Sequence, residues 1–364
     1  MATEDLLKEI TEARGPSGYE TEIRELAAEK LAAFSDEVRT DVMGNLIALE
    51  RGEGEEPRPS VMLTAHMDEI ALMVTGKEKG FLRVTEIGGF DARVLMGQAV
   101  TVHGKRELPG LVVSVPPHFT RPADREKPVP LDRLFVDVGL PPSETEDLVA
   151  IGDCITLRAR YTPLSEGYAS SKSMDDRAGL AAIVLALEEL GRRRHSWDVC
   201  AVATVQEEES FAGAVTGAYH LEPTLAIAVD GTFGQQPGLS TPETVKMDAG
   251  PSIALGPNIH PRVYDRLVEA AKAADIPFQP EAQPGNTATD AWPIQVSRSG
   301  IPTGLVGIPI RYMHTAVETL ALRDIERTAR LLAEFVSRLD TAFAETLSVR
   351  DALQERREGG QPCS

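Results

Sequence analysis

The feature that most constrains the fold is a change of sequence pattern inside the chain. From residue 71 to about residue 163, short β-like runs are separated by glycine and proline, and no long amphipathic helix appears. On both sides of this stretch, helical and strand patterns alternate, which is typical of an α/β domain. The pattern therefore predicts an α/β domain made of both ends of the chain and interrupted by a small β-barrel or sandwich.

We expect the α/β domain to be discontinuous and to comprise residues 1–69 and 164–354. The inserted β domain would occupy residues 70–163, and the polar segment 355–364 would form a disordered tail. The insert returns the chain near Asp175, so His66 and Asp175 can be neighbours although they are far apart in the sequence.

Apolar runs and helical periodicity define the elements expected in the α/β domain. Residues 46–49 follow the turn pair Gly44-Asn45, which Val42 precedes, and this arrangement predicts a hairpin. Further strands are expected at 61–64, 199–205, 225–229 and 303–306. Helices are expected at 4–14, 20–34, 174–190, 212–219, 262–274, 290–297 and 322–339.

Charge and cysteine content exclude several classes of protein. A net charge of −19 argues against a surface for nucleic acid or anionic membrane, both of which require clustered Lys and Arg. The sequence shows no secretory signal pattern and no apolar run long enough to span a membrane. The three cysteines are far apart and odd in number, which indicates free thiols in a reducing compartment. We therefore expect a cytoplasmic protein.

Histidine and carboxylate side chains stand where the expected strands end. His66-Met67-Asp68 follows the strand at 61–64, and ligands of open α/β sheets gather at the carboxyl ends of strands. One nitrogen of His66 could bind a metal while Asp68 holds the other. An incidental loop histidine beside an acidic residue is the simpler alternative.

Three glutamates, residues 207–209, follow the strand at 199–205 in the same way. Near a metal, two of these carboxylates could have different roles: one would bind the cation, and the other would accept a proton from water. A solvated acidic turn is the alternative. At the start of the helix from Met174, Asp175 could bridge two cations. The simpler alternative is that Asp175 or Asp176 only caps the helix.

Asp230 ends the strand at 225–229, and His314 lies beyond the last strand. Together, the candidates share one location, the strand ends and helix starts of the α/β domain. These candidates are His66, Asp175, Glu207, Glu208, Asp230 and His314. Such a mixture of nitrogen and oxygen donors suits Zn²⁺, Co²⁺ or Mn²⁺, and it favours a dinuclear metal site. The sequence lacks both the Gly-x-Ser-x-Gly elbow of serine hydrolases and a phosphate-binding loop.

Four motifs follow one another along the chain: AHMDEI at 65–70, MDDRAG at 174–179, VQEE at 205–208 and RYMH at 311–314. They resemble the ordered motifs of one family, the tetrahedral aminopeptidases, which are dinuclear metallopeptidases. Further similarity lies in GPSGYE at 15–20, GQAV at 97–100 and VDVG at 136–139, so the resemblance covers nearly the whole chain.

The resemblance implies an α/β/α metallopeptidase domain with a mixed central sheet and a β-barrel-like dimerisation insert. One divalent ion would be bound by His66, Asp175 and Asp230, and a second by Asp175, Glu208 and His314. Glu207 would be the general base, and Asp68 would orient His66. The family also implies a cis peptide between Asp175 and Asp176, peptide substrates, and dimers that assemble into a hollow dodecamer.

The chain departs from the family pattern after Glu208, where the run Glu209-Ser210-Phe211 replaces Val-Gly. In the Gly-Thr-Asp-Ala motif, alanine replaces glycine, giving ATDA at 288–291. Glu209 and the overall acidity favour a basic N-terminal residue in the substrate. The rival functions are a metal-dependent deacylase or amidohydrolase, an endoglucanase, and a catalytically silent assembly protein.

Overall fold

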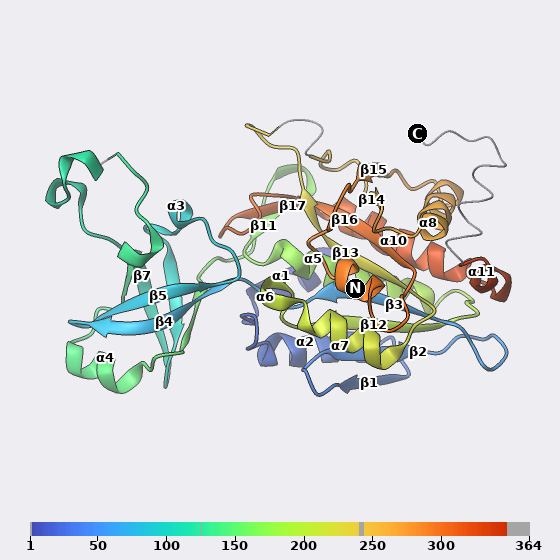
Figure 1. Cartoon of the computed structure of the whole chain (residues 1–364), viewed down its shortest axis with the longest axis horizontal. Helices are drawn as coiled ribbons and strands as arrows, with labels where there is room; N and C mark the ends of the chain where they lie inside the picture. The colour runs from blue at the N-terminus through green and yellow to red at the C-terminus, as the bar shows by residue number, and fades with distance from the viewer. Residues whose placement is uncertain (1, 125, 240–243, 348–364) are drawn as a thin grey trace.

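The chain folds into a large mixed β-sheet flanked by helices and a separate closed barrel, which lies to the left in Figure 1. This computed structural model describes residues 2–124, 126–239 and 244–347. The predicted fold class, an α/β/α domain with an inserted barrel, is confirmed. The expected tail at 355–364 lies outside the described residues.

Four parallel strands form the centre of the eleven-stranded sheet, in the order β12, β3, β13 and β16. They are β3 (Ser60–His66), β12 (Asp198–Thr204), β13 (Leu225–Phe233) and β16 (Thr303–Arg311). Nearly all of their residues are buried, as expected of parallel strands covered on both faces.

Antiparallel strands extend this centre on both sides. Beside β12 lie β2 (Leu46–Glu50) and β1 (Glu37–Thr40). Beyond β16 lie β17 (Glu318–Ala321), β11 (Tyr168–Ser171) and β10 (Thr162–Pro163). In addition, β14 (Ser252–Leu255) pairs with β16 and with β15 (Gln279–Ala282).

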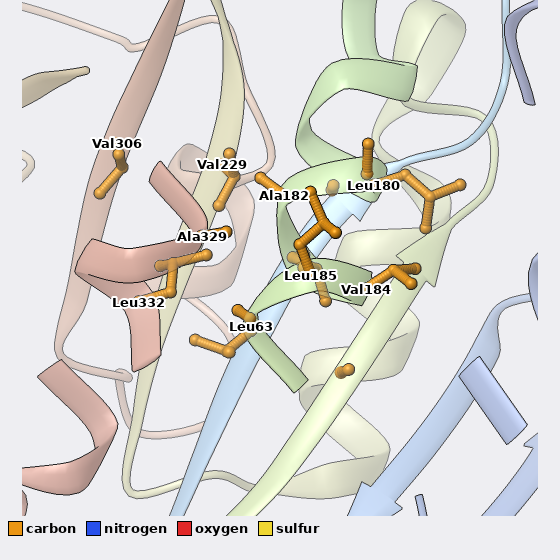
Figure 2. Packing of buried hydrophobic residues seen from close by; sticks show 14 of the residues in the cluster. Leu63, Leu180, Ala182, Val184, Leu185, Val229, Val306, Ala329 and Leu332 are labelled. Carbon is orange, nitrogen blue, oxygen red and sulfur yellow. The ribbon is translucent and has the colours of Figure 1, made fainter. Parts of the chain in front are cut away.

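Helices cover both faces of the sheet, because alternate residues of each buried strand point to opposite layers. In β3, Leu63 joins the core beneath α5 (Met174–Leu190), while its neighbour Met62 packs on the other face with residues of α7 (Ala212–Leu221) and α9 (Ala291–Gln295). Figure 2 shows Leu63 and Val229 packed with Leu185 of α5 and Leu332 of α10 (Leu322–Ser337).

The first face carries α1 (Thr3–Glu12), α2 (Thr21–Ala32), α5 (Met174–Leu190), α8 (Pro261–Ala273) and α10 (Leu322–Ser337). The second face carries α7 (Ala212–Leu221) and α9 (Ala291–Gln295). Two short helices complete the domain, α6 (Glu207–Ser210) and α11 (Thr341–Glu345), together with the 3-10 turn η4 (Ser165–Gly167).

The barrel is entirely antiparallel and closes in the order β4, β5, β8, β7, β6 and β9. Its strands are β4 (Ala71–Glu78), β5 (Phe81–Ile87), β6 (Ala99–His103), β7 (Glu107–Val113), β8 (Phe135–Asp137) and β9 (Cys154–Leu157). Between them lie α3 (Ala92–Leu95), α4 (Pro142–Leu148), η1 (Pro117–Phe119), η2 (Pro122–Asp124) and η3 (Leu131–Arg133). The barrel has its own apolar core, formed by Leu72, Leu82 and Val136 among others.

Several predicted elements differ from the observed ones. Val42 lies in the turn between β1 and β2 and is fully exposed, so it is not a strand residue. The helix expected at 290–297 is limited to Ala291–Gln295, whereas the strand expected at 303–306 continues to Arg311. Among the described residues, no helix is both long and apolar enough to cross a membrane.

Candidate metal centre

The ends of the central parallel strands bring the first candidate residues together at one edge of the sheet. His66 is the last residue of β3 and pairs in register with Thr204, the last residue of β12. Asp230 lies on β13, on the other side of β3. After β12, Gln206 adopts a left-handed conformation with φ of 57° and turns the chain into α6, which begins at Glu207.

Asp175 lies between two histidines. Its Oδ1 is 3.3 Å from Nε2 of His66, and its Oδ2 is 3.8 Å from Nε2 of His314. His314 is also 3.5 Å from Oε2 of Glu208, and its Nδ1 is 2.8 Å from the carbonyl oxygen of Gly89. Asp175 is therefore positioned to contribute to two groups of donors at once.

The donor atoms form two such groups. His66, Asp175 and Asp230 make the first, and Asp175, Glu208 and His314 make the second, with the atoms of each group within 4.8 Å of one another. Glu207 stands beside them, with Oε2 3.9 Å from Nε2 of His66. All the residues that the sequence singled out as metal ligands or base thus lie together.

Asp68 contacts both the histidine and the loop that carries the glutamates. Its Oδ1 is 3.5 Å from Nδ1 of His66 and accepts a hydrogen bond from the backbone N–H of Glu207 at 3.0 Å. Its Oδ2 accepts the backbone N–H of Glu208 at 3.1 Å. This buried carboxylate therefore connects the end of β3 with the start of α6, a second role that the sequence did not indicate.

The other two carboxylates at the start of α5 and α6 have different surroundings. Asp176 is fully buried, and its Oδ1 accepts the backbone N–H of Gly179, so it caps the helix. The peptide between Asp175 and Asp176 is cis, as the family resemblance implied. Glu209 accepts a hydrogen bond from the N–H of Gly88 at 2.6 Å, which connects it to the loop after β5.

Glu318 is a buried residue of the site that the sequence reasoning missed. Its two oxygens accept backbone N–H groups, one from Asp175 at 3.1 Å and one from His314 at 2.7 Å. Glu318 therefore fixes the distance between two segments that carry donors to the second group. Its only sequence signal is a carboxylate four residues after His314.

A second missed residue, Asp290, lies in the ATDA segment. Its Oδ2 accepts hydrogen bonds from the hydroxyl of Thr204 at 2.5 Å and from that of Thr64 at 3.3 Å. Asp290 is buried beneath the strand ends, and burial raises its pKa to about 6. The ATDA segment itself was the available signal.

A buried ion pair joins three of the motifs. Oε2 of Glu69 lies 2.7 Å from Nζ of Lys172 and accepts the hydroxyl of Ser173, also at 2.7 Å. Its Oε1 accepts the backbone N–H of Gly15 at 2.9 Å. Glu69 thus connects the GPSG turn, the segment after β3 and the approach to α5.

The carboxylates of the site are crowded in a buried region. Burial raises the pKa of Glu208 and Asp230 well above the usual carboxyl range, and the charge of Asp175 adds to this effect. Burial likewise raises the pKa of Glu207 to about 11. Burial alone would lower the pKa of His66, but Glu207 and Asp175 raise it well above its ordinary value.

These shifts have one physical cause, an excess of negative charge removed from water. A bound cation relieves such repulsion, and two histidine nitrogens with carboxylate oxygens are the donors that Zn²⁺, Co²⁺ and Mn²⁺ accept. The residues therefore fit divalent metal. A cleft of about 510 Å³ opens onto them, and no Lys or Arg of the described chain lines it.

The α/β/α domain thus carries, at its strand ends, a set of side chains that could hold divalent metal. The sequence comparisons identify the family: its model, described as M42 glutamyl aminopeptidase, matches residues 44–331. A second model, described as AMPT, matches residues 2–26. The chain belongs to the M42 aminopeptidase family and is a peptidase.

Similar proteins span more than nine-tenths of the chain. The lysyl aminopeptidase of Pyrococcus furiosus is 37% identical over 345 residues, covering 93% of this chain and 98% of that protein. The TET aminopeptidase of the marine sediment archaeon Thaumarchaeota archaeon SCGC AB-539-E09 has a TM-score of 0.90 at 31% identity, covering 95% and 99% of the two chains. The Pyrococcus horikoshii TET1 peptidase, which can assemble into a tetrahedron or a large octahedral shell, has a TM-score of 0.80 at 32% identity over 93% and 100%.

Proposed function

We propose that this protein is a metal-dependent aminopeptidase that removes N-terminal residues from peptides. The observation that carries the proposal is the position of Asp175 in both donor groups, with Glu207 beside them. A carboxylate shared between two donor groups suits a pair of ions about 3.5–4 Å apart, the spacing found in two-metal hydrolases and aminopeptidases.

The proposed division of the ligands is the one that the family resemblance implied. His66, Asp175 and Asp230 would hold one ion, and Asp175, Glu208 and His314 the other, with Zn²⁺ or Co²⁺ as the expected ion and Mn²⁺ as an alternative. Bound ions would supply Lewis-acid polarisation and lower the pKa of water. Asp68 would hold His66 in one orientation through its second ring nitrogen.

Glu207 would act as the general base. It takes a proton from the water whose oxygen attacks the carbonyl carbon of the first peptide bond. It then returns the proton to the leaving nitrogen as the C–N bond breaks, which releases the N-terminal residue and a peptide shortened by one. Asp68 supports this role, because it fixes the backbone N–H of Glu207 and of Glu208.

We further propose that the two domains have different functions and that the protein assembles into a multimer. The described parts of residues 1–69 and 164–354 would form the catalytic domain, and those of residues 70–163 a dimerisation domain; residues 348–354 lie outside the described residues. Exposed apolar side chains on the barrel, including Leu111, Phe119 and Ile151, support an interface there. Likeness to the tetrahedral TET1 peptidase supports a dimer-based dodecamer.

We place the protein in the cytoplasm. Its buried cysteines, Cys154 and Cys200, are unpaired, which suits a reducing compartment.

Chelation and metal add-back test the function. The chelated protein should lose turnover of aminoacyl-p-nitroanilides, and Zn²⁺ or Co²⁺ should restore it. Hydrolysis of glucan that survives the chelator would favour an endoglucanase, since glycosidases use two carboxylates and usually no transition metal. No hydrolysis of any aminoacyl substrate by the metal-loaded protein would refute the proposal.

A further inference from the structure

The comparisons point to opposite substrates, since the family model is described as glutamyl and the Pyrococcus furiosus relative as lysyl. Resting on the aminopeptidase function proposed above, we propose that Glu281 selects peptides whose N-terminal side chain is positively charged, Lys or Arg. Glu281 lies on β15, a strand at the border of the large sheet, and lines the cleft that opens onto the metal centre.

Neutral donors hold the carboxylate of Glu281 in place. The hydroxyl of Thr232 donates to Oε1 at 2.8 Å, and Nε2 of Gln283 donates to the same oxygen at 3.0 Å. The hydroxyl of Ser252 donates to Oε2. These contacts fix the direction of the carboxylate without neutralising its charge, because none of these three donors is a cation.

The surrounding backbone is shaped to allow these contacts. On β16, Gly307 faces Ser252 and Thr232, and a Cβ at this position would lie 2.3 Å from Oγ of Ser252 and 2.9 Å from Cγ2 of Thr232. A larger residue would displace both hydroxyls that orient Glu281. The site is therefore built from three strands, β13, β14 and β16, around a carboxylate of a fourth.

Glu281 supplies the negative charge that remains in the cleft once metal is bound to the other carboxylates. The other acidic residues lining the cleft are Asp175, Glu207, Glu208 and Asp230, which are the proposed ligands and base. No Lys or Arg of the described chain lines the cleft, so an acidic substrate side chain would meet repulsion there without a compensating partner. A cationic side chain would instead form a charge-assisted hydrogen bond with Glu281.

The position of Glu281 suits the length of a lysine side chain. Thr232, which contacts Glu281, is two residues beyond Asp230 on β13, and both line the cleft. At about 3.3 Å per residue, that spacing is about 7 Å along the strand, within reach of a flexible four-carbon stem. Apolar side chains that line the same cleft, including Phe233 and Met313, can cover the stem while its charged end meets Glu281.

Glu209, the residue that the sequence suggested for this preference, has another role. Its carboxylate accepts the backbone N–H of Gly88, and it is absent from the lining of the cleft. Glu209 therefore gives a matched control, a glutamate close to the same site with a different contact.

The test compares lysyl- and norleucyl-p-nitroanilide, because norleucine keeps the apolar stem of lysine and lacks its charge. The metal-loaded protein should show a kcat/KM at least tenfold higher for the lysyl substrate, the effect of one charged hydrogen bond. Glu281→Gln should reduce this ratio at least tenfold, whereas Glu209→Gln should leave it within about twofold. Calorimetry gives a second readout: L-lysinamide should bind the unchanged protein more tightly than L-norleucinamide, and Glu281→Gln should remove the difference.

Two results separate the possible failures. A wild-type protein that hydrolyses the norleucyl substrate at least as well as the lysyl one, or a ratio unchanged in Glu281→Gln, would refute selection by Glu281 and leave the aminopeptidase function intact. If the metal-loaded protein hydrolyses neither substrate, the proposed function fails, and the proposed selection fails with it.

Discussion

Oδ1 of Asp175 lies 3.3 Å from Nε2 of His66, and this contact turns Oδ2 toward His314 on the other side of the site. The two histidines come from opposite ends of the sequence, and one carboxylate lies between them. Glu318 maintains this arrangement, because it accepts the backbone N–H of both Asp175 and His314.

Asp175→Asn should weaken both metal sites at once, because an amide offers one oxygen and no charge. We expect the metal content, measured by mass spectrometry after dialysis, to fall from two ions per chain to less than one. Asp176→Asn is the matched control: its side-chain oxygen can still accept the N–H of Gly179, so both ions should remain. Equal metal loss in the two variants would argue against Asp175 as a ligand shared by two ions.

Glu207→Gln should keep both ions and lower kcat at least about a hundredfold, because glutamine cannot take a proton from water. Turnover and metal content are measured on the same preparation, which separates loss of the base from loss of metal. Near-normal kcat in this variant would exclude Glu207 as the base.

Lys172→Met should destabilise the protein by about 3–5 kcal/mol, because it leaves the buried carboxylate of Glu69 without its partner. The free energy of unfolding would be measured by urea denaturation. In a Glu69→Gln background the same change should cost clearly less, since the lysine then no longer faces a charged residue 69. A similar loss in both backgrounds would mean that lost packing, not the ion pair, explains the effect.

Stability should fall at alkaline pH through the two buried thiols. Burial raises the pKa of Cys154 and of Cys200 to about 11, whereas the pKa of an unfolded cysteine is about 8.5. Protonated thiols thus favour the folded state fully below about pH 8.5, and this contribution disappears as the pH rises toward 11. Between pH 7 and 10, Tm should fall less for the double variant Cys154→Ala/Cys200→Ala than for the unchanged protein. An equal fall in both proteins would mean that the two thiols do not cause the loss of stability.

The sequence predicted the parts of the fold that leave a local pattern. The apolar strands ending at His66 and before Asp230 were visible because buried parallel strands are continuously hydrophobic. The barrel was visible as short strands between glycine and proline. These signals located the candidate ligands, and the structure brings them together.

What the sequence did not predict depends on contacts between distant segments. Glu318 acts through backbone N–H groups, which leave no trace in residue type. β15, with the sequence QPEA, lacks apolar alternation because it is a partly exposed strand at the border of the sheet, so Glu281 was overlooked. Proximity along the chain instead favoured Glu209, whose side chain contacts Gly88.

Anomalous diffraction from crystals of the Zn²⁺-loaded protein tests the central proposal most directly. We expect two peaks about 3.5–4 Å apart, each within coordination distance of one oxygen of Asp175, with Glu207 facing the space between them. A single peak, or a second ion without contact to Asp175, would contradict the dinuclear site.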